Sequence, residues 1–586
     1  ESKEGNITFN AGESAIAAGS NASDLLTNVP LVAKDPDGKI TVRGKEPKIL
    51  IDDKPVELNL QQLQDLLESM PGSSIDKIEV MTNPPPQYAN EQGGVINIVT
   101  KKGRVGISGR VSITAGTRGE ANMNGSFTYR KKGLAININA GGGYNEYEGN
   151  GYSFRNNIYT DSSNFFNSTN NYTNKNFRPN VRAKIDYDIN KNNLLDFVFN
   201  YNQNGYDNTN NTEYQNINRF NELWRLSRRQ VHSDGDNYSP NISLSYTWKG
   251  KPGETLKIIT GYNFSSNQND RLFFFYFLNP DFTPTGLDSM QQQLNNTKIN
   301  NYSIRVSYDK MLGNKKTFLS VGAFLNNSNN QVIVNASYQK KPEGSMEKLE
   351  LLSNHFRFHQ TISNLRASVK QIFGKGFSIT AGSSVESTGI WFELLKENRD
   401  VKNNYFTWLP FANINISWKE ALNLTFAYRR SIRRPGIGQL NPTIDFSDPY
   451  NIRFGNEKLE ASTAHNFDFI AGRTKPKYYV NIGFGYNIVQ DIFSQVRTLL
   501  PDGKTQVTWE NISGRKEYEI SSWNGITLTK KLKVNVSASY TYSKYSAFDI
   551  SVRKFRNGGS FTSNINSGFA ATALWNITGG FNVNRF

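Results

Sequence analysis

The chain of 586 residues is too long for one ordinary domain. Hydrophobic residues make up 37% and aromatic residues 12%, which is low for a packed globular interior but suits a sheet with one apolar face. The net charge of +16 comes from basic residues that are scattered along the chain, without a recognition helix or a compact basic motif, so we expect no nucleic-acid binding.

Two features of composition limit the interpretation further. The sequence contains no cysteine, which excludes disulfides, thiol catalysis and zinc sites with cysteine ligands. Its most apolar stretch, residues 272–278, is much shorter than the roughly 18 residues of a membrane helix. A membrane-bound form of this chain would therefore have to cross the bilayer as a β-barrel.

Residues 1–103 are typical of a small α/β domain with a core of its own. Residues 21–30 predict a short helix that ends at Pro30, and a turn at residues 35–38 leads into a strand. The leucines and the methionine of residues 60–70 fall at helical spacing. Strands are expected at residues 39–43, 48–52, 75–80 and 94–100.

Beyond residue 104 the helix signals mostly vanish, and apolar residues alternate with polar ones. Residues 105–115, 242–248 and 532–542 show the pattern, which gives a strand one apolar face and one polar face. Because such strands fill most of the chain, residues 104–586 predict a large antiparallel barrel with lipid outside and water inside.

Short turns and long polar stretches alternate along this region. Turns recur, for example, at residues 131–133, 190–192 and 249–253, whereas residues 156–176 and 201–235 are expected to be long polar loops. Short turns at one end and long loops at the other are typical of outer-membrane barrels.

Aromatic residues often precede the short turns, which suggests a belt at the membrane boundary. The alternative is that aromatic residues are simply frequent in strands. The residues concerned are Tyr129, Tyr187, Trp248, Tyr308, Phe373 and Trp418.

The spacing of the turns also predicts the number of strands. Two strands precede the first short turn, two fill each later interval, and one more runs from about residue 577 to the end, which gives roughly 19 strands. Single-chain bacterial barrels have even numbers of strands. We therefore expect about 22 strands in the parent protein, with the last ones missing here, unless the count is wrong by one.

A series of segments in the first domain resembles the plug domain of TonB-dependent outer-membrane receptors. The segments are, in order, residues 22–30, 38–44, 49–55, 75–84 and 93–103. Within the barrel, residues 428–435 (YRRSIRRP), 440–442, 448–449 and 455–459 resemble a loop signature of the same receptors. Together these matches frame most of the chain.

The resemblance implies that residues 1–103 form a plug inside a barrel of residues 104–586. In this family the ligand binds where the plug apex meets the extracellular loops, and TonB delivers energy from the inner membrane to remodel the plug. The sequence departs from the family pattern in two respects. No TonB-contacting box is visible before the plug, which begins almost at Glu1. The last strands of the barrel are also expected to be missing.

Several residues are candidates for contacts of the plug. Gln87 and Tyr88 lie in a proline-rich loop that would meet ligand at the plug apex or would simply pack against the barrel. Arg43, Glu79 and Arg305 are expected to join the plug to the polar inner wall of the barrel. Such polar contacts near water are exchangeable, so they allow a plug that blocks the lumen and still moves.

Four arginines, at positions 429, 430, 433 and 434, form a dense cationic cluster beside Pro435. We expect Arg430, Arg433 and Arg434 to hold an anionic ligand or lipopolysaccharide phosphates through charge-assisted hydrogen bonds. The alternative is a loop that is held in place by ion pairs between arginine and carboxylate groups.

Signals of enzymes are poor. The four histidines are His232, His355, His359 and His465, and the residues between His355 and His359 lack the glutamate of a zinc protease motif. No serine or aspartate lies in a recognisable nucleophile setting. We therefore expect neither catalytic residues nor a metal site nor a cofactor.

The sequence favours a receptor and transporter in the outer membrane that imports a scarce or large nutrient with energy from TonB. The expected partners are TonB, outer-membrane lipid and lipopolysaccharide, and a glycan, a peptide or an anionic metal chelate as ligand, with a surface lipoprotein as a further candidate. Two alternatives stay open. One is a passive or secretion-related barrel with a fixed plug, and the other is a secreted β-repeat adhesin.

Overall fold

The structure is a computed structural model. It describes residues 2–3, 6–11, 21–34, 40–42, 45–56, 63–64, 66–67, 70, 72–81, 84, 88, 91, 93–101, 106–117, 119–158, 163–339, 344–350, 352–374, 376–396, 398–418, 422–442, 444, 451–475, 477–501, 504–512, 514–529, 532–549, 554–570 and 576–585.

The N-terminal region folds as an α/β domain around a six-stranded sheet of order β1-β2-β7-β8-β5-β6. A separate pair of antiparallel strands, β3 and β4, lies beside α1. The elements are β1 (Ser2–Lys3), β2 (Asn6–Phe9), α1 (Ala22–Thr27), β3 (Val32–Lys34), β4 (Ile40–Val42), β5 (Lys48–Ile51), β6 (Lys54–Pro55), the 3-10 helix η3 (Gly72–Ser74), β7 (Ile75–Met81) and β8 (Val95–Thr100).

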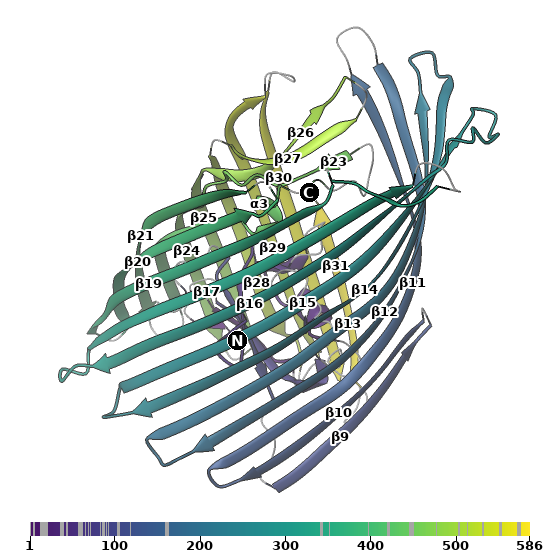
Figure 1. Cartoon of the computed structure of the whole chain (residues 1–586). Helices are drawn as coiled ribbons and strands as arrows, with labels where there is room; N and C mark the ends of the chain where they lie inside the picture. The colour runs from purple at the N-terminus through teal and green to yellow at the C-terminus, as the bar shows by residue number, and fades with distance from the viewer. Residues whose placement is uncertain are drawn as a thin grey trace.

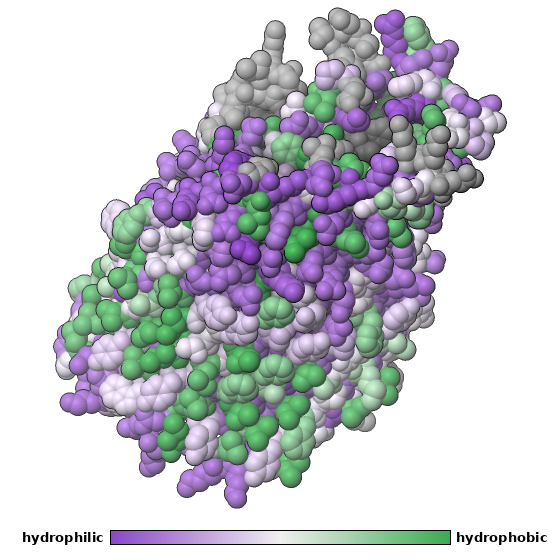
Figure 2. All heavy atoms as spheres, viewed as in Figure 1, coloured by the Kyte–Doolittle hydropathy of each residue, from purple (hydrophilic) through white to green (hydrophobic). Residues whose placement is uncertain are grey.

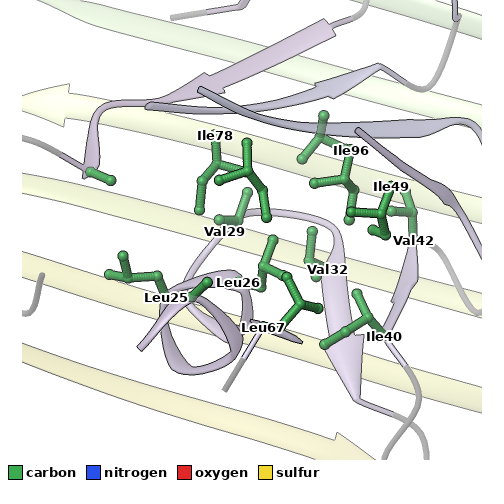
Figure 3. Packing of buried hydrophobic residues seen from close by; sticks show 14 of the residues in the cluster. Leu25, Leu26, Val29, Val32, Ile40, Val42, Ile49, Leu67, Ile78 and Ile96 are labelled. Carbon is green, nitrogen blue, oxygen red and sulfur yellow. The ribbon is translucent and has the colours of Figure 1, made fainter. Parts of the chain in front are cut away.

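Helix α1 begins where its sequence predicts. The side chain of Asn21 accepts a hydrogen bond from the backbone N–H of Asp24, and the carboxylate of Asp24 accepts one from the N–H of Asn21. This capping box satisfies two donors at the helix start. Leu25 and Leu26 are then fully buried against the sheet (Figure 3), so the helix forms one side of the core of the domain. No helix in the described ranges is long and apolar enough to cross a membrane.

The remaining chain forms a barrel around the N-terminal domain (Figure 1). We call this N-terminal domain the plug. The barrel strands are β9 (Gly106–Gly116), β10 (Glu120–Lys131), β11 (Leu134–Ile158), β12 (Ser163–Asp188), β13 (Asn193–Ile217), β14 (Leu223–Lys249), β15 (Glu254–Leu278), β16 (Ser289–Met311), β17 (Thr317–Gln339), β18 (Glu347–Lys348), β19 (Asn354–Gly374), β20 (Phe377–Leu394), β21 (Arg399–Trp418), β22 (Leu422–Arg433), β24 (Ser462–Lys475), β25 (Tyr478–Gln490), β28 (Arg515–Thr527), β29 (Leu532–Asp549), β30 (Lys554–Ala570) and β31 (Asn576–Arg585).

The barrel strands follow one another around the wall in chain order, and the structure describes nineteen long strands plus β18, which has two residues. The expected large antiparallel barrel of about 19 visible strands is therefore confirmed. Consecutive strands pair in antiparallel register, as in β12 with β13 and β13 with β14.

The expectation of long polar loops at residues 156–176 and 201–235 was wrong, because both stretches lie mostly in paired strands. Strands β11 to β17 have 23 to 27 residues, whereas about 10 are enough to cross a bilayer. Apolar side chains gather over the lower part of the wall, and the upper part is hydrophilic (Figure 2). The upper halves of β11 to β14 are rich in polar residues on both faces, so their sequence lacks the apolar alternation.

A small three-stranded sheet lies at the upper end of the barrel in Figure 1. It consists of β23 (Asn451–Arg453), β27 (Thr505–Ile512) and β26 (Ile492–Leu499) in this order, and the short helix α3 (Ile437–Leu440) precedes it in the chain. We call the three strands and α3 the roof.

Candidate ligand-binding site

Four neighbouring strands, β12 to β15, line a cavity of about 710 Å³ on the inner face of the barrel. Along β13, Asn200 and Asn202 face the plug, and the next inward position, Asn204, begins the wall of the cavity. The cavity therefore lies beyond the plug, toward the end of the barrel that carries the roof. We call it the chamber.

The chamber is lined by amide, aromatic and guanidinium groups. Eight of its residues are asparagines, namely Asn174, Asn176, Asn204, Asn208, Asn210, Asn237, Asn267 and Asn269. Tyr172, Tyr206 and Phe273 add aromatic faces, and Arg178, Arg229 and Arg271 add positive charge. No aspartate or glutamate is among the lining residues that the structure describes.

Some of these groups have unused hydrogen-bonding capacity. Asn204 is 7% exposed, and its Oδ1 has no hydrogen-bond partner among the described residues; the same is true of Oδ1 in Asn208 and Asn269. A buried amide oxygen without a partner costs free energy. A ligand with hydroxyl or amide donors would satisfy these oxygens, so the chamber has the chemistry of a binding site.

The plug is fixed to the wall below the chamber by a buried ion pair. Asp52 Oδ2 lies 3.0 Å from Arg182 Nη2 and 3.5 Å from Lys184 Nζ, both on β12. The backbone N–H of Thr100 also donates to Asp52 Oδ1 at 2.8 Å. Burial by itself raises the pKa of Asp52, but Lys184, Arg182 and the hydrogen bonds from Thr100 outweigh it and hold the pKa below its ordinary value.

A second polar contact lies on the opposite wall. Lys45 of the plug donates a hydrogen bond to Asn466 Oδ1 at 3.3 Å, and its Nζ lies 3.8 Å from Glu517. Burial lowers the pKa of Lys45, and the nearby Glu517 and Glu519 partly offset this effect. The plug is thus held by charges of both signs on two sides of the lumen.

The plug also shares its hydrophobic core with the wall. Ile470 of β24 and Trp523 of β28 are buried in the same cluster as Leu25, Leu26 and Ile78 of the plug. Trp523 has no exposed surface. Displacing the plug would expose these apolar surfaces, so the ion pairs are only part of what holds it in place.

The roof packs on the wall through a second apolar cluster. Leu440 of α3 and Phe493 of β26 lie against Phe356 and Phe392 of β19 and β20. Phe356 and Phe392 stack with ring centroids 4.9 Å apart. This cluster anchors the roof to one side of the mouth.

Polar contacts tie the roof to other parts of the wall. Arg155 of β11 donates from Nη1 to Asn451 Oδ1 of β23 and to Thr505 Oγ1 of β27, both at 3.0 Å. Arg399 of β21 forms a two-pronged ion pair with Glu457, in the segment that follows β23. The roof itself bridges the mouth from β19 and β20 to β11.

The plug residues singled out from the sequence have different surroundings. Tyr88 is buried, and the guanidinium of Arg305 on β16 lies 5.0 Å from its ring centroid, so these two residues meet across the boundary between plug and barrel. Glu79 contacts two polar residues of the plug among the described residues, Lys77 at 2.5 Å and Asn97 at 2.9 Å. Arg43 and Gln87 lie outside the described residues.

The arginine cluster beside Pro435 is divided by the structure. Arg430 lies on the outer face of β22, opposite His465 in the register of β22 and β24. Its guanidinium donates a hydrogen bond to the carbonyl of Trp408 at 3.2 Å. Arg433 faces the roof, with its guanidinium 4.9 Å from the Phe493 ring. Arg434 forms an ion pair with the buried Glu386, as in the alternative interpretation of this cluster. The three side chains do not converge on one ligand.

Sequence reasoning missed the chamber. Its asparagines recur at every second position in β12 and β13, as at Asn174 and Asn176 or Asn208 and Asn210. This period of two is the signal of a strand with a polar inner face. It was hidden because the residues between them are polar as well.

The histidines do not form a metal centre. His355 Nε2 lies 3.0 Å from the amide of Gln331, and His359 Nδ1 lies 2.7 Å from Asn329 Oδ1. His232 Nδ1 lies 3.6 Å from Asp207 on the outer face of β14. The described part of the chain contains no group of three or more side chains that could hold a metal ion.

The fold is similar to that of several solved structures. The siderophore receptor PirA from Pseudomonas aeruginosa superposes with a TM-score of 0.60 at 14% identity, over 100% of this chain and 92% of that chain. The copper transporter OprC gives 0.64 at 12% identity, over 100% and 89%. The ferric citrate transporter FecA gives 0.57 at 13% identity, over 96% and 83%.

These likenesses show the fold, and at that level they confirm the expected resemblance to TonB-dependent receptors. No curated protein matches the chain. Residues 248–585, which are more than half of the chain, match the family described as outer membrane protein beta-barrel family. The chain therefore belongs to the outer membrane protein beta-barrel family and resides in the outer membrane as a plugged β-barrel.

Proposed function

We propose that this protein is an outer-membrane receptor that binds a nutrient in the chamber and imports it with energy delivered through TonB. The observation that carries the proposal is the place of the chamber. It lies between a plug that is bound to the wall and a roof that bridges the mouth, and its lining offers unsatisfied buried amide oxygens.

The contacts of the plug support transport. Two polar contacts join the plug to the wall, namely the ion pair between Asp52 and Arg182 and the hydrogen bond from Lys45 to Asn466. Water can take the place of either partner when the plug moves. The apolar contact with Trp523 makes spontaneous displacement costly. An external source of energy is therefore needed to open the path, and the resemblance to TonB-dependent receptors makes TonB the partner that we propose for this role.

The other expected partners fit the outer face of the barrel. Arg430 lies on that face beside Trp408, which is 57% exposed. An arginine next to a boundary aromatic residue can bind the phosphates of lipopolysaccharide. We propose that Arg430 contacts lipid rather than the ligand. We also propose that the contact between Tyr88 and Arg305 changes when the plug moves relative to the wall.

The experiment blocks the chamber with a bulky side chain and measures two quantities, the small molecules that stay bound and their uptake by cells. In the full-length protein in its own outer membrane, Ser233→Trp places an indole inside the chamber, whereas Asp234→Trp places the same group on the outer face of the same strand. Native mass spectrometry of the purified proteins compares the small molecules that remain bound. Uptake of those molecules is then measured in cells with and without TonB.

We expect the unaltered protein and Asp234→Trp to retain a ligand that Ser233→Trp loses, and we expect uptake to require TonB. Uptake that continues unchanged without TonB would contradict energised import and would favour a passive barrel. Equal retention in both variants would show that the chamber is not the site.

A further inference from the structure

We infer that the outer face of strands β22, β24, β25, β28 and β29 carries a binding site for one phosphorylated glycolipid of the outer leaflet, the lipid A part of lipopolysaccharide. The inference rests on the lipid contact that we propose for Arg430, and it does not involve the chamber. It is carried by a row of basic residues and by the aromatic residues below them. The basic residues are Arg430, His465, Lys516 and Lys544.

The register of the barrel places these four side chains at one level, which we call the basic row. Arg430 of β22 is opposite His465 of β24, and His465 is opposite Ile488 of β25. Ile488 is opposite Lys516 of β28, which in turn is opposite Lys544 of β29. Because neighbouring strands lie about 4.8 Å apart, the row extends over about 19 Å of the wall.

The basic row points away from the lumen. Asn466 and Glu517, which follow His465 and Lys516 in the chain, contact Lys45 of the plug and therefore lie on the inner face. Successive side chains of a strand point to opposite faces, so His465 and Lys516 lie on the outer face. The outward positions of these strands that the structure describes between the short turns and the basic row include no aspartate or glutamate.

An aromatic row lies directly below the basic row, two residues nearer to the short turns on every strand. Its members are opposite one another in the same register, namely Tyr428, Phe467, Tyr486, Tyr518 and Tyr542. The ring centroids of Tyr428 and Phe467 are 5.1 Å apart, and those of Tyr486 and Tyr518 are 5.2 Å apart. Tyr428 Oη lies 3.0 Å from His465 Nδ1, so the two rows are in contact.

The aromatic row marks the depth at which the lipid head groups begin. The next outward level consists of Phe426, Phe469, Phe484, Ile520 and Tyr540, which face the hydrocarbon. Tyrosine is enriched at the boundary between hydrocarbon and water, so the basic row above it lies at the level of lipid phosphates. Since short turns mark the periplasmic end of such barrels, the row faces the outer leaflet.

Positive charge is not a general feature of the outer face. On the other side of the barrel, Asp207 of β13, Asp234 of β14 and Asp270 of β15 are opposite one another in the register. They alternate with residues that line the chamber and therefore point outward. These carboxylates repel phosphate groups, so a phosphorylated lipid is directed to the side of the barrel that carries the basic row.

The two rows together match the two parts of lipid A. Guanidinium and ammonium groups form charge-assisted hydrogen bonds with phosphate oxygens, and a row of several such groups suits a head group with more than one phosphate. The Arg430 guanidinium donates from Nη1 to the carbonyl of Trp408, whereas its Nε has no hydrogen-bond partner among the described residues. A phosphate oxygen would satisfy this donor, and the acyl chains would lie on the aromatic row below.

The test measures lipid binding to the full-length protein in mild detergent by native mass spectrometry. The three probes are lipid A with two phosphates, the same lipid A without phosphates, and phosphatidylglycerol. Lys516→Gln with Lys544→Gln removes two charges of the basic row. The matched control, Lys249→Gln with Lys251→Gln, removes two exposed lysines at the short turn between β14 and β15. Heat-dependent migration in gels verifies that each variant is folded.

We expect the unaltered protein to bind one molecule of phosphorylated lipid A more tightly than either of the other probes. The variant of the basic row should bind it at least about tenfold more weakly, which corresponds to about 1.4 kcal/mol. The control at the short turn should bind it within about twofold of the unaltered protein. Added salt should reduce the difference between the two variants.

Three results would overturn the inference. They are equal affinity of the folded variants for lipid A, binding of lipid A that does not depend on its phosphates, and phosphatidylglycerol binding as tightly as lipid A. None of them contradicts nutrient import, which is measured separately by ligand retention in the chamber and by uptake with TonB. Conversely, equal ligand retention in Ser233→Trp and Asp234→Trp would contradict the proposed chamber and leave the lipid site standing.

Discussion

The carboxylate of Asp52 in the plug lies 3.0 Å from the guanidinium of Arg182 on the inner wall of β12. Both side chains are largely buried, with exposed fractions of 8% and 14%. Asp52 reaches the wall from a tight turn between β5 and β6, where it and Asp53 adopt φ values of 52° and 63°. The turn therefore presents a charge on the surface of the plug that faces the inner wall of β12.

Replacement of Asp52 by Asn should loosen the plug. It leaves Arg182 as a buried cation without the carboxylate it contacts, whereas Lys184 keeps Asp186 at 3.6 Å. Breaking a buried pair in this way costs about 3 kcal/mol or more. Hydrogen exchange of β5 (Lys48–Ile51), followed by mass spectrometry, should show faster opening. The double variant with Arg182→Gln should lose less than the sum of the two single changes, and strict additivity would show that the pair does not couple plug and wall.

The stability of the plug should rise with pH because of Lys54. Burial, partly offset by Asp196, lowers the pKa of Lys54 from 10.5 to about 8. Between these two pH values the unfolded chain binds more protons at this residue than the folded plug, so the free energy of unfolding increases as the pH rises. The full contribution is about 3 kcal/mol.

Lys54→Met should therefore stabilise the plug at pH 7 and remove this rise above pH 8. Scanning calorimetry of the plug transition at several pH values measures both effects. Lys101→Met, at an exposed position of the plug, serves as the control and should retain the rise. A pH dependence that is identical in Lys54→Met and the unaltered protein would assign it to other groups.

Arg155→Gln should release one side of the roof. The change shortens the side chain and removes the hydrogen bonds from Nη1 to Asn451 and Thr505, with an expected loss of about 2 kcal/mol. Hydrogen exchange should become faster in β23 and at the Thr505 end of β27, while the plug strands stay unchanged. Arg357→Gln removes the ion pair between Arg357, on the outer face of β19, and Glu393 of β20. This control should leave the roof as it is.

The sequence by itself determined the barrel and the plug. Alternation with a period of two depends only on local strand geometry, so residues 242–248 and 532–542 indicate lipid-facing strands without any knowledge of their neighbours. The helix at residues 22–27 was equally local, because Asn21 and Asp24 form its cap within one turn. The polar upper halves of β11–β14 escaped this reasoning because polar residues occupy both of their faces.

The chamber was decided only by the tertiary structure. Arg178 and Arg271 are far apart in the sequence and are brought to successive levels of one wall by the register of β12 to β15. Conversely, Arg430 and Arg433 are close in sequence but lie on opposite faces of β22, and Arg433 contacts the Phe493 ring of the roof. Hydrogen bonds between strands set which residues meet, and a single strand does not carry the register of its neighbours, so proximity in sequence does not show which arginines lie together.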